Sequence, residues 1–134
     1  MTESGPHIGD IFWQDLTVHN ADEVRDFYRD VAGWEFRSED MGGYEDYHML
    51  APGTEGSVAG ICHARGPNAG VPPQWLVYIL VADVDQSVQR CVERGGEVVD
   101  GPRDTGSGRF CVIRDPAGAV CAVYAHAGRN PQEA

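Results

Sequence analysis

Histidine side chains are the first groups in this sequence that could bind a metal ion or move a proton. No two of them have the H-x-x-x-H or H-x-H spacing that places two imidazoles on one face of a helix or strand. The five are His7, His19, His48, His63 and His126. Only His48 and His63 fall on strand-like segments, and because these segments are neighbours, an atypical metal site shared by the two stays open. A lone histidine bonded at the edge of a sheet is the commoner arrangement.

The cysteines offer little further chemistry. Cys62, Cys91, Cys111 and Cys121 form no C-x-x-C pair and lie inside apolar segments. Cysteines in such surroundings behave as small buried hydrophobic residues. We expect all four to be reduced and structural.

Composition limits the partners and the location. With 134 residues, 42% hydrophobic and 23% charged, the chain has the size and balance of one globular domain. A net charge of -11 repels phosphate backbones and anionic lipid surfaces, so nucleic acid and membrane partners are not expected. The N-terminus, MTESGPHIGD, lacks a basic and then apolar leader, and the longest apolar run is strand-sized. We therefore expect a cytoplasmic protein.

The first half of the sequence predicts a strand, a helix and three more strands. Residues 11–18 are rich in aromatic and β-branched types, as strands are. Apolar residues then recur at i, i+3, i+4 and i+7, and Gly33 is placed to end this helix. The members of this stripe are Val24, Phe27, Tyr28 and Val31. Three strand-like runs follow at 34–38, 44–50 and 56–64, separated by turn-forming segments.

The second half repeats this order after a connector at 65–73, whose glycines and prolines suit neither a helix nor a central strand. A strand is predicted at 74–82, a helix cap at Asp83, and a helix that ends at Gly95 and Gly96. Its apolar stripe contains Val84, Val88, Cys91 and Val92. Short strands are predicted at 97–99, 109–114 and 119–125, the last two joined by a DPAG turn.

The two halves match when one is shifted along the other. A shift of 63 carries Val18 to Val81, Asn20 to Asp83, Asp22 to Asp85 and Gly33 to Gly96, and a shift of 62 carries Gly60 to Ala122. Such a repeat implies two similar modules that need each other to close a core. A cleft between them is expected.

At this point the sequence resembles the vicinal-oxygen-chelate (VOC) superfamily, the glyoxalase, bleomycin resistance protein and extradiol dioxygenase group. The segments that carry the resemblance are FWQDLTV before VRDFYRDVAGWEF, then VAGI, QWLVYILVADVDQSV and RDPAGAVCAVY. It covers about residues 8–127, with modules at about 8–64 and 74–127 and tails at 1–7 and 128–134. The resemblance implies an α+β fold in which paired βαβββ modules form an incomplete barrel around a central cleft, usually as a homodimer.

The resemblance also implies four inward positions that hold a divalent metal in this family. Registering the motifs places them at Trp13, Gly60, Leu76 and Ala122, none of which has a nitrogen or oxygen donor suited to a metal. A slip by one residue would supply Gln14 or Gln74 as weak donors. It would also turn the strands over and expose their apolar side chains to the wrong environment. We expect no metal and no other cofactor.

Strand alternation from these four positions predicts which side chains line the cleft. The predicted ligand-binding residues are Trp13, Thr17, Gly60, Cys62 and Leu76, to which we add Tyr47, His48 and Arg109 from strands whose facing the sequence does not set. Asp15 also points into this apolar lining, where desolvation would raise its pKa into a range useful for proton transfer. We expect Asp15 to be the base, with Tyr78 or His48 as the acid. The competing interpretation makes Asp15 one member of a buried pair with Arg109, Tyr44 or Tyr47.

Three functions remain open at this level. The first is a protein that binds a small organic molecule in an apolar cleft without a metal, for which Gly60 would leave room. The second is a metal-free isomerase, epimerase or lyase that uses Asp15 as its base. The third is a divalent-metal lyase or dioxygenase, which the four non-ligand positions oppose.

Overall fold

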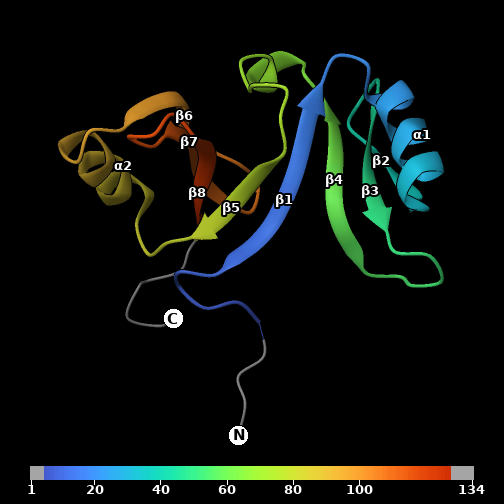
Figure 1. The fold of residues 1–134 in the computed structure, drawn as a ribbon, viewed down its shortest axis with the longest axis horizontal. Helices are drawn as coiled ribbons and strands as arrows, with labels where there is room; N and C mark the ends of the chain where they lie inside the picture. The colour runs from blue at the N-terminus through green and yellow to red at the C-terminus, as the bar shows by residue number, and fades with distance from the viewer. Residues whose placement is uncertain (1–4, 128–134) are drawn as a thin grey trace, which may run out of the picture. The chain divides into compact units, whose positions relative to one another are not determined.

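The computed structural model describes residues 5–127. The chain divides into two compact units, which we call the first half, Trp13–Trp75, and the second half, Met1–Phe12 with Leu76–Ala134. Each unit contains a helix followed by strands, and these elements are labelled in Figure 1. The α+β fold with two βαβββ modules is confirmed.

Four strands and one helix form the first half, except that the first two residues of the first strand, Ile11 and Phe12, belong to the second half. They are β1 (Ile11–Val18), α1 (Ala21–Ala32), β2 (Glu35–Asp40), β3 (Glu45–Leu50) and β4 (Ser57–His63). Their order in the sheet is β2-β3-β4-β1. Strand β1 is parallel to β4, whereas β3 is antiparallel to both of its neighbours. The connector that follows contains one short 3-10 turn, η1 (Gly66–Asn68).

Helix α1 forms where the apolar stripe predicted it. Gly33 ends it in a left-handed conformation with φ of 75°, and its N–H donates to the Arg29 carbonyl. The helix packs on one face of the sheet. The buried core on this side consists of Ala21, Tyr47, Met49 and Ile61, with Trp34, Trp75 and other rings packed around it. We call the opposite side the helix-free face of the first half.

The second half repeats the arrangement. Its elements are β5 (Leu76–Leu80), α2 (Val84–Glu93), β6 (Glu97–Asp104), β7 (Gly108–Arg114) and β8 (Val120–His126), in the sheet order β5-β8-β7-β6. The Asp83 side chain caps α2 by accepting a hydrogen bond from the Gln86 N–H at 3.1 Å, as predicted. The core beneath α2 is formed by Val84, Cys111 and Val123.

Strand β6 differs most from the expectation, because it runs to Asp104 instead of ending at residue 99. It pairs only with β7, and the pairing shifts register before and after Asp100. An edge position explains why Pro102 is tolerated within a strand. Neither helix in the described part of the chain is long and apolar enough to cross a membrane. Much of the predicted tails, residues 1–4 and 128–134, lies outside the described residues.

Candidate functional site

A glycine lies at the centre of the helix-free face of the first half, between two titratable side chains. Asp15 pairs with Gly60 across β1 and β4, and His48 pairs with Gly60 across β3 and β4. Paired residues point to the same side of a sheet. The neighbours Tyr47 and Ile61 belong to the core beneath α1, so Asp15, Gly60 and His48 occupy the other face.

Three side chains surround Gly60. A Cβ added there would lie 3.2 Å from the Asp15 Cβ, 3.4 Å from Cζ2 of the Trp13 indole and 3.8 Å from the Cys62 sulfur. Trp13, Asp15 and Cys62 therefore share the face that strand alternation predicted. We expected free space over Gly60, but the Trp13 ring and the Cβ of Asp15 occupy it. Thr17, which pairs with Cys62, is buried at the same face.

The thiol of Cys62 is held in its neutral form. Burial raises the pKa of Cys62 far above its ordinary value, and the negative charges of Asp15 and Asp46 raise it further. A neutral thiol is a weak hydrogen-bond donor and a poor nucleophile. Cys62 therefore contributes shape and a weak donor to this face.

The imidazole of His48 is held by a hydrogen bond at one of its two ring nitrogens. Its Nε2 lies 2.6 Å from Oε1 of Glu39 on β2, and its side chain is 31% exposed. A carboxylate accepts only, so neutral His48 carries its proton on Nε2. Its Nδ1 is buried and makes no hydrogen bond to any group among residues 5–127. The lone pair of this nitrogen can therefore accept a hydrogen bond.

Tyr47 was predicted to bind ligand, but the structure places it on the helix side. It is 5% exposed, its hydroxyl donates to Asp22 at the start of α1, and the Arg25 guanidinium lies 4.7 Å from its ring centroid. Burial and the Asp22 carboxylate raise the pKa of Tyr47 to about 12. Strand alternation thus sends the Tyr47 side chain away from Gly60, and its role in ligand binding stays a prediction.

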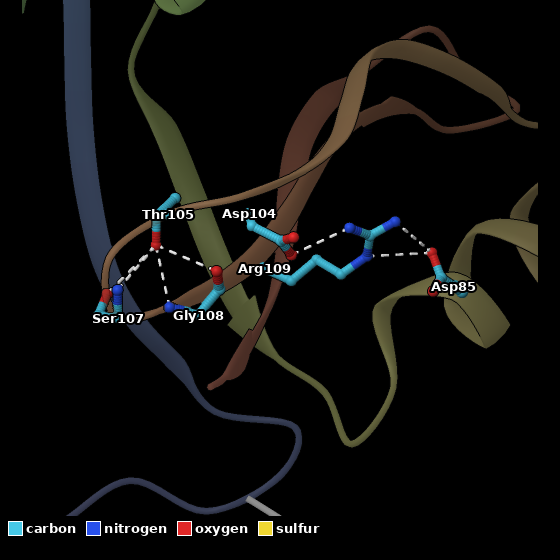
Figure 2. Close-up of polar contacts among 6 residues, drawn as sticks. All are labelled: Asp85, Asp104, Thr105, Ser107, Gly108 and Arg109. Atoms are coloured by element: carbon cyan, nitrogen blue, oxygen red, sulfur yellow. Dashed lines mark hydrogen bonds and ion pairs between the residues drawn. The ribbon is translucent and has the colours of Figure 1, made fainter. Parts of the chain in front are cut away.

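Arg109 was also predicted to bind ligand, and that role stays a prediction. It pairs with Ala125, whose side chain packs in the core beneath α2, so it lies on the helix side of the second half. Its guanidinium bonds to Asp85 at 3.0 Å and to Asp104 at 3.0 Å, as Figure 2 shows. The turn beside it is tied together by the Thr105 hydroxyl.

Leu76 and Tyr78 belong to the second half. Leu76 is 1% exposed, and Tyr78 pairs with Ala122, which is fully buried. The Tyr78 ring lies 6.2 Å from the Phe110 ring. These residues share the side of their sheet that faces away from α2. A joint role of Tyr78 with Asp15 remains a prediction.

Comparison with known proteins identifies the family. The sequence profile of the Glyoxalase/Bleomycin resistance protein/Dioxygenase superfamily matches residues 6–123. The chain belongs to this superfamily. Among solved structures, a variant of the Streptomyces coelicolor methylmalonyl-CoA epimerase in complex with 2-nitronate-propionyl-CoA is similar, with a TM-score of 0.54, 18% identity and coverage of 92% of this chain and 99% of that one. A superfamily member from Vibrio splendidus 12B01 also has a TM-score of 0.54, with 13% identity over 84% of this chain and 96% of that one.

Curated superfamily relatives are closer in sequence. The glyoxylase-like protein CFP32 of Mycobacterium bovis (strain ATCC BAA-935 / AF2122/97) is 34% identical over 116 residues, which is 86% of this chain and 43% of the relative. The anthracycline biosynthesis protein DnrV of Streptomyces peucetius is 34% identical over 117 residues, or 86% and 41%. The chain thus spans less than half the length of these relatives.

The four residues at the positions that the resemblance implies for the superfamily's metal do not fit a metal ion. Trp13 and Gly60 meet on the helix-free face of the first half, and Leu76 and Ala122 are buried in the second, but none has a metal donor. His48 and His63 do not form an alternative site, because His63 faces Asp22 on the helix side, with 3.4 Å between Nε2 and Oδ1. Within residues 5–127 no three His, Cys, Asp or Glu side chains are grouped so as to hold a metal.

Two acidic residues of this face were missed by sequence reasoning. Glu39 holds His48, and Asp46, 7% exposed, accepts the His63 backbone N–H at 2.8 Å and lies beside the Cys62 thiol. Glu39 lies on β2 and Asp46 on β3, in segments whose sequence is typical of a polar strand at the edge of a sheet. Alternation from His48 along β3 would have placed Asp46 on the same side, but the sequence alone does not say which side His48 takes.

Proposed function

We propose that this VOC-superfamily protein binds a small organic molecule on the helix-free face of its first half, without a metal at the four family positions. The observation that supports this most is the packing around Gly60, where an indole, a carboxylate and a thiol converge. Large rings with a few polar groups are the usual composition of small-molecule sites. Trp13 offers a stacking surface, and Asp15 offers an acceptor beside it.

The class of ligand is proposed from the relatives. DnrV is named for anthracycline biosynthesis, and anthracyclines are planar polycyclic molecules with ring oxygens. A planar ring system suits the exposed part of the Trp13 indole, and its hydroxyl groups suit Asp15. An anthracycline is therefore our first probe.

Thermal unfolding tests the proposal. A ligand that binds the folded form stabilises it by mass action, by about 2.7 kcal/mol at a concentration of 100 times its Kd. We expect the anthracycline to raise Tm and expect Zn²⁺, Ni²⁺, Mn²⁺ and Fe²⁺ to leave Tm unchanged. A rise with one equivalent of any of these metals, and none with the anthracycline, would contradict the proposal and favour divalent-metal chemistry.

A second candidate function is metal-free proton transfer, as in an isomerase or epimerase. It is favoured by one observation, namely that Asp15 and His48 flank Gly60 on the same face. Two strand spacings separate their backbones by about 10 Å. Asp15 would take a proton from the substrate carbon, and His48, when protonated on Nδ1, would return one from the other side.

Deuterium exchange tests this second function. Methylmalonyl-CoA is the probe, because the similar fold of an epimerase binds it and its C–H next to a carbonyl is acidic. In D₂O the protein should catalyse exchange at this carbon, and Asp15→Asn or His48→Gln should each slow it by about 10²-fold or more. Asp30→Asn on the exposed side of α1 is the control. Exchange no faster than without protein would end this candidate and leave the binding function standing.

We also propose that the protein is a cytoplasmic homodimer without a nucleic acid partner. The superfamily resemblance supports the dimer, and the net charge of -11 supports the absence of nucleic acid binding. Sedimentation velocity at micromolar concentration should give a mass of two chains. A single-chain mass across that range would overturn the dimer.

A further inference from the structure

The carboxylate of Glu39 lies next to the site at Gly60 but on a different strand. Glu39 belongs to β2, the edge strand, which pairs only with β3. Arg37 lies opposite His48 in this pairing, so Glu39, two residues further along β2, points to the same face as His48. Because β3 lies between β2 and β4, the carboxylate reaches His48 from the side opposite to Gly60.

One short hydrogen bond joins the two side chains. Nε2 of His48 donates to Oε1 of Glu39 over 2.6 Å. Hydrogen bonds to an ionised carboxylate are shorter and stronger than those between neutral groups. The bond that one ring nitrogen makes decides which nitrogen of a histidine carries the proton. Glu39 thereby fixes both the orientation of the His48 ring and the position of its proton.

The other ring nitrogen of His48 is turned away from Glu39. Nδ1 is buried and bonds to no group within residues 5–127. It carries a lone pair in the neutral ring and a proton in the imidazolium ion, whereas Nε2 carries a proton in both states. Gain or loss of a proton by His48 therefore changes Nδ1 alone.

The other charged groups near His48 on this face bond to different partners. Asp46, two residues before it on β3, accepts the His63 backbone N–H at 2.8 Å. Nη2 of Arg37 donates to a serine hydroxyl on β4 at 3.3 Å. Glu39 is thus the carboxylate whose charge acts directly on the imidazole.

We propose that Glu39 is a positioning residue for proton transfer at the site of Gly60, an inference that rests on the second candidate function. Asp15 takes a proton from the substrate carbon, and the electron pair of that C–H bond moves onto the neighbouring carbonyl to give an enolate. His48 then returns a proton from Nδ1 to the other side of the carbon, and its ring becomes neutral. Exchange of protons with water restores Asp15 and His48.

The role of Glu39 in this cycle is electrostatic and geometric. Its charge stabilises the imidazolium ion that must form before His48 can donate, and its hydrogen bond keeps Nδ1 directed at the substrate. Glu39 does not touch the substrate itself. Its effect on the reaction should therefore pass entirely through His48.

Deuterium exchange into methylmalonyl-CoA tests this dependence. Glu39→Gln keeps an acceptor for Nε2 but removes the charge, so kcat for exchange should fall by about tenfold or more while KM stays nearly unchanged. In His48→Gln protein the same substitution should have no further effect, because residues that act as one unit are not additive. Glu35→Gln makes the same charge change on the same strand and face, and it should leave the rate unchanged.

The failures of this proposal and of the proposed function are distinguishable. Exchange that is catalysed but insensitive to Glu39→Gln would overturn this proposal alone. A loss of rate of the same size in the His48→Gln background would also overturn it, since Glu39 would then act without His48. Exchange no faster than without protein would overturn the proton-transfer function and this proposal together.

Nuclear magnetic resonance tests the positioning without any substrate. A ring proton held in a short hydrogen bond exchanges slowly with water, so the Nε2–H signal of His48, assigned through His48→Gln, should be visible at neutral pH. It should disappear in Glu39→Leu and persist in Glu35→Leu. Glu39 is 55% exposed on an edge strand, so its removal leaves the buried core intact. A signal missing from the natural protein, or one that survives in Glu39→Leu, would overturn the proposal.

Discussion

Asp15 and His48 lie in register on opposite sides of Gly60, on the face of the first-half sheet that α1 does not cover. The glycine brings two titratable side chains together with no side chain of its own between them. Trp13 and Cys62 close the space directly above it. This local arrangement leads to the following predictions.

Substitution of Gly60 should disturb this packing. In Gly60→Ala the new methyl group would lie 3.2 Å from the Asp15 Cβ and 3.4 Å from the Trp13 ring, both of which must then move. Overpacking of this kind costs about 1–3 kcal/mol. Urea unfolding should show that loss, and affinity for the anthracycline probe should fall with it. Gly56→Ala, where the methyl group meets nothing within 4 Å, should change stability by no more than about 0.5 kcal/mol.

The Trp13 ring should carry part of the binding energy. Trp13→Leu removes an aromatic stacking surface worth about 0.5–1.5 kcal/mol, so calorimetry should show the anthracycline binding about 2- to 12-fold more weakly. Trp75→Phe is the control, because Trp75 packs against Tyr28 and Trp34 on the helix side. Equal losses in both variants would mean that Trp13 acts only through stability.

Tyr47 should make stability depend on pH in the alkaline range. Its pKa is raised to about 12 in the folded protein, against about 10 when unfolded. Between these values the unfolded chain has lost the proton that the folded chain keeps, so stability falls as pH rises from about 10 to about 12. The slope from this residue is at most about 1.4 kcal/mol per pH unit. Below pH 10 it contributes no slope.

Urea unfolding of the natural protein and of Tyr47→Phe at pH 9 and pH 11 measures this contribution. The free energy of unfolding should drop more steeply with pH in the natural protein than in the variant, which has no phenol to ionise. Parallel pH dependences would show that Tyr47 ionises as freely in the folded state as in the unfolded one.

Arg109 should matter for the structure of the second half and not for binding. Arg109→Ala removes the exposed bridges to Asp85 and Asp104, so we expect a small decrease in Tm and an unchanged Kd for the anthracycline. Arg114→Ala, which breaks an exposed bridge to Glu97, is the comparison and should behave alike. A large loss of affinity in Arg109→Ala but not in Arg114→Ala would show that Arg109 takes part in ligand binding.

The fold could be predicted from the sequence because the signals for helix starts and ends agreed with the spacing of the apolar residues. The cap at Asp83, the stop at Gly33 and the stripe on α1 each gave an element that the structure contains. The end of β6 was missed because Gly101 and Pro102 weaken the strand pattern, while pairing with β7 holds the segment extended nonetheless.

Part of the site could be predicted as well. Trp13, Asp15, Gly60 and Cys62 share one face because the pairing of β1 with β4 preserves strand alternation. Tyr47, His48 and Arg109 could not be placed, since a shift of one residue exchanges the two faces of a strand and nothing local fixes that register. Tertiary contacts with the helices decide it, as the bonds from Tyr47 to Asp22 and from Arg109 to Asp85 show.

The most direct measurement is a titration of the chelator-treated protein with the anthracycline, followed through the indole N–H signals of its three tryptophans in two-dimensional NMR spectra. We predict that the signal of Trp13, assigned through Trp13→Leu, shifts with saturation while the signals of Trp34 and Trp75 stay in place. Shifts that occur only after a divalent metal is added, or that spare Trp13, would contradict a metal-free binding site at Gly60.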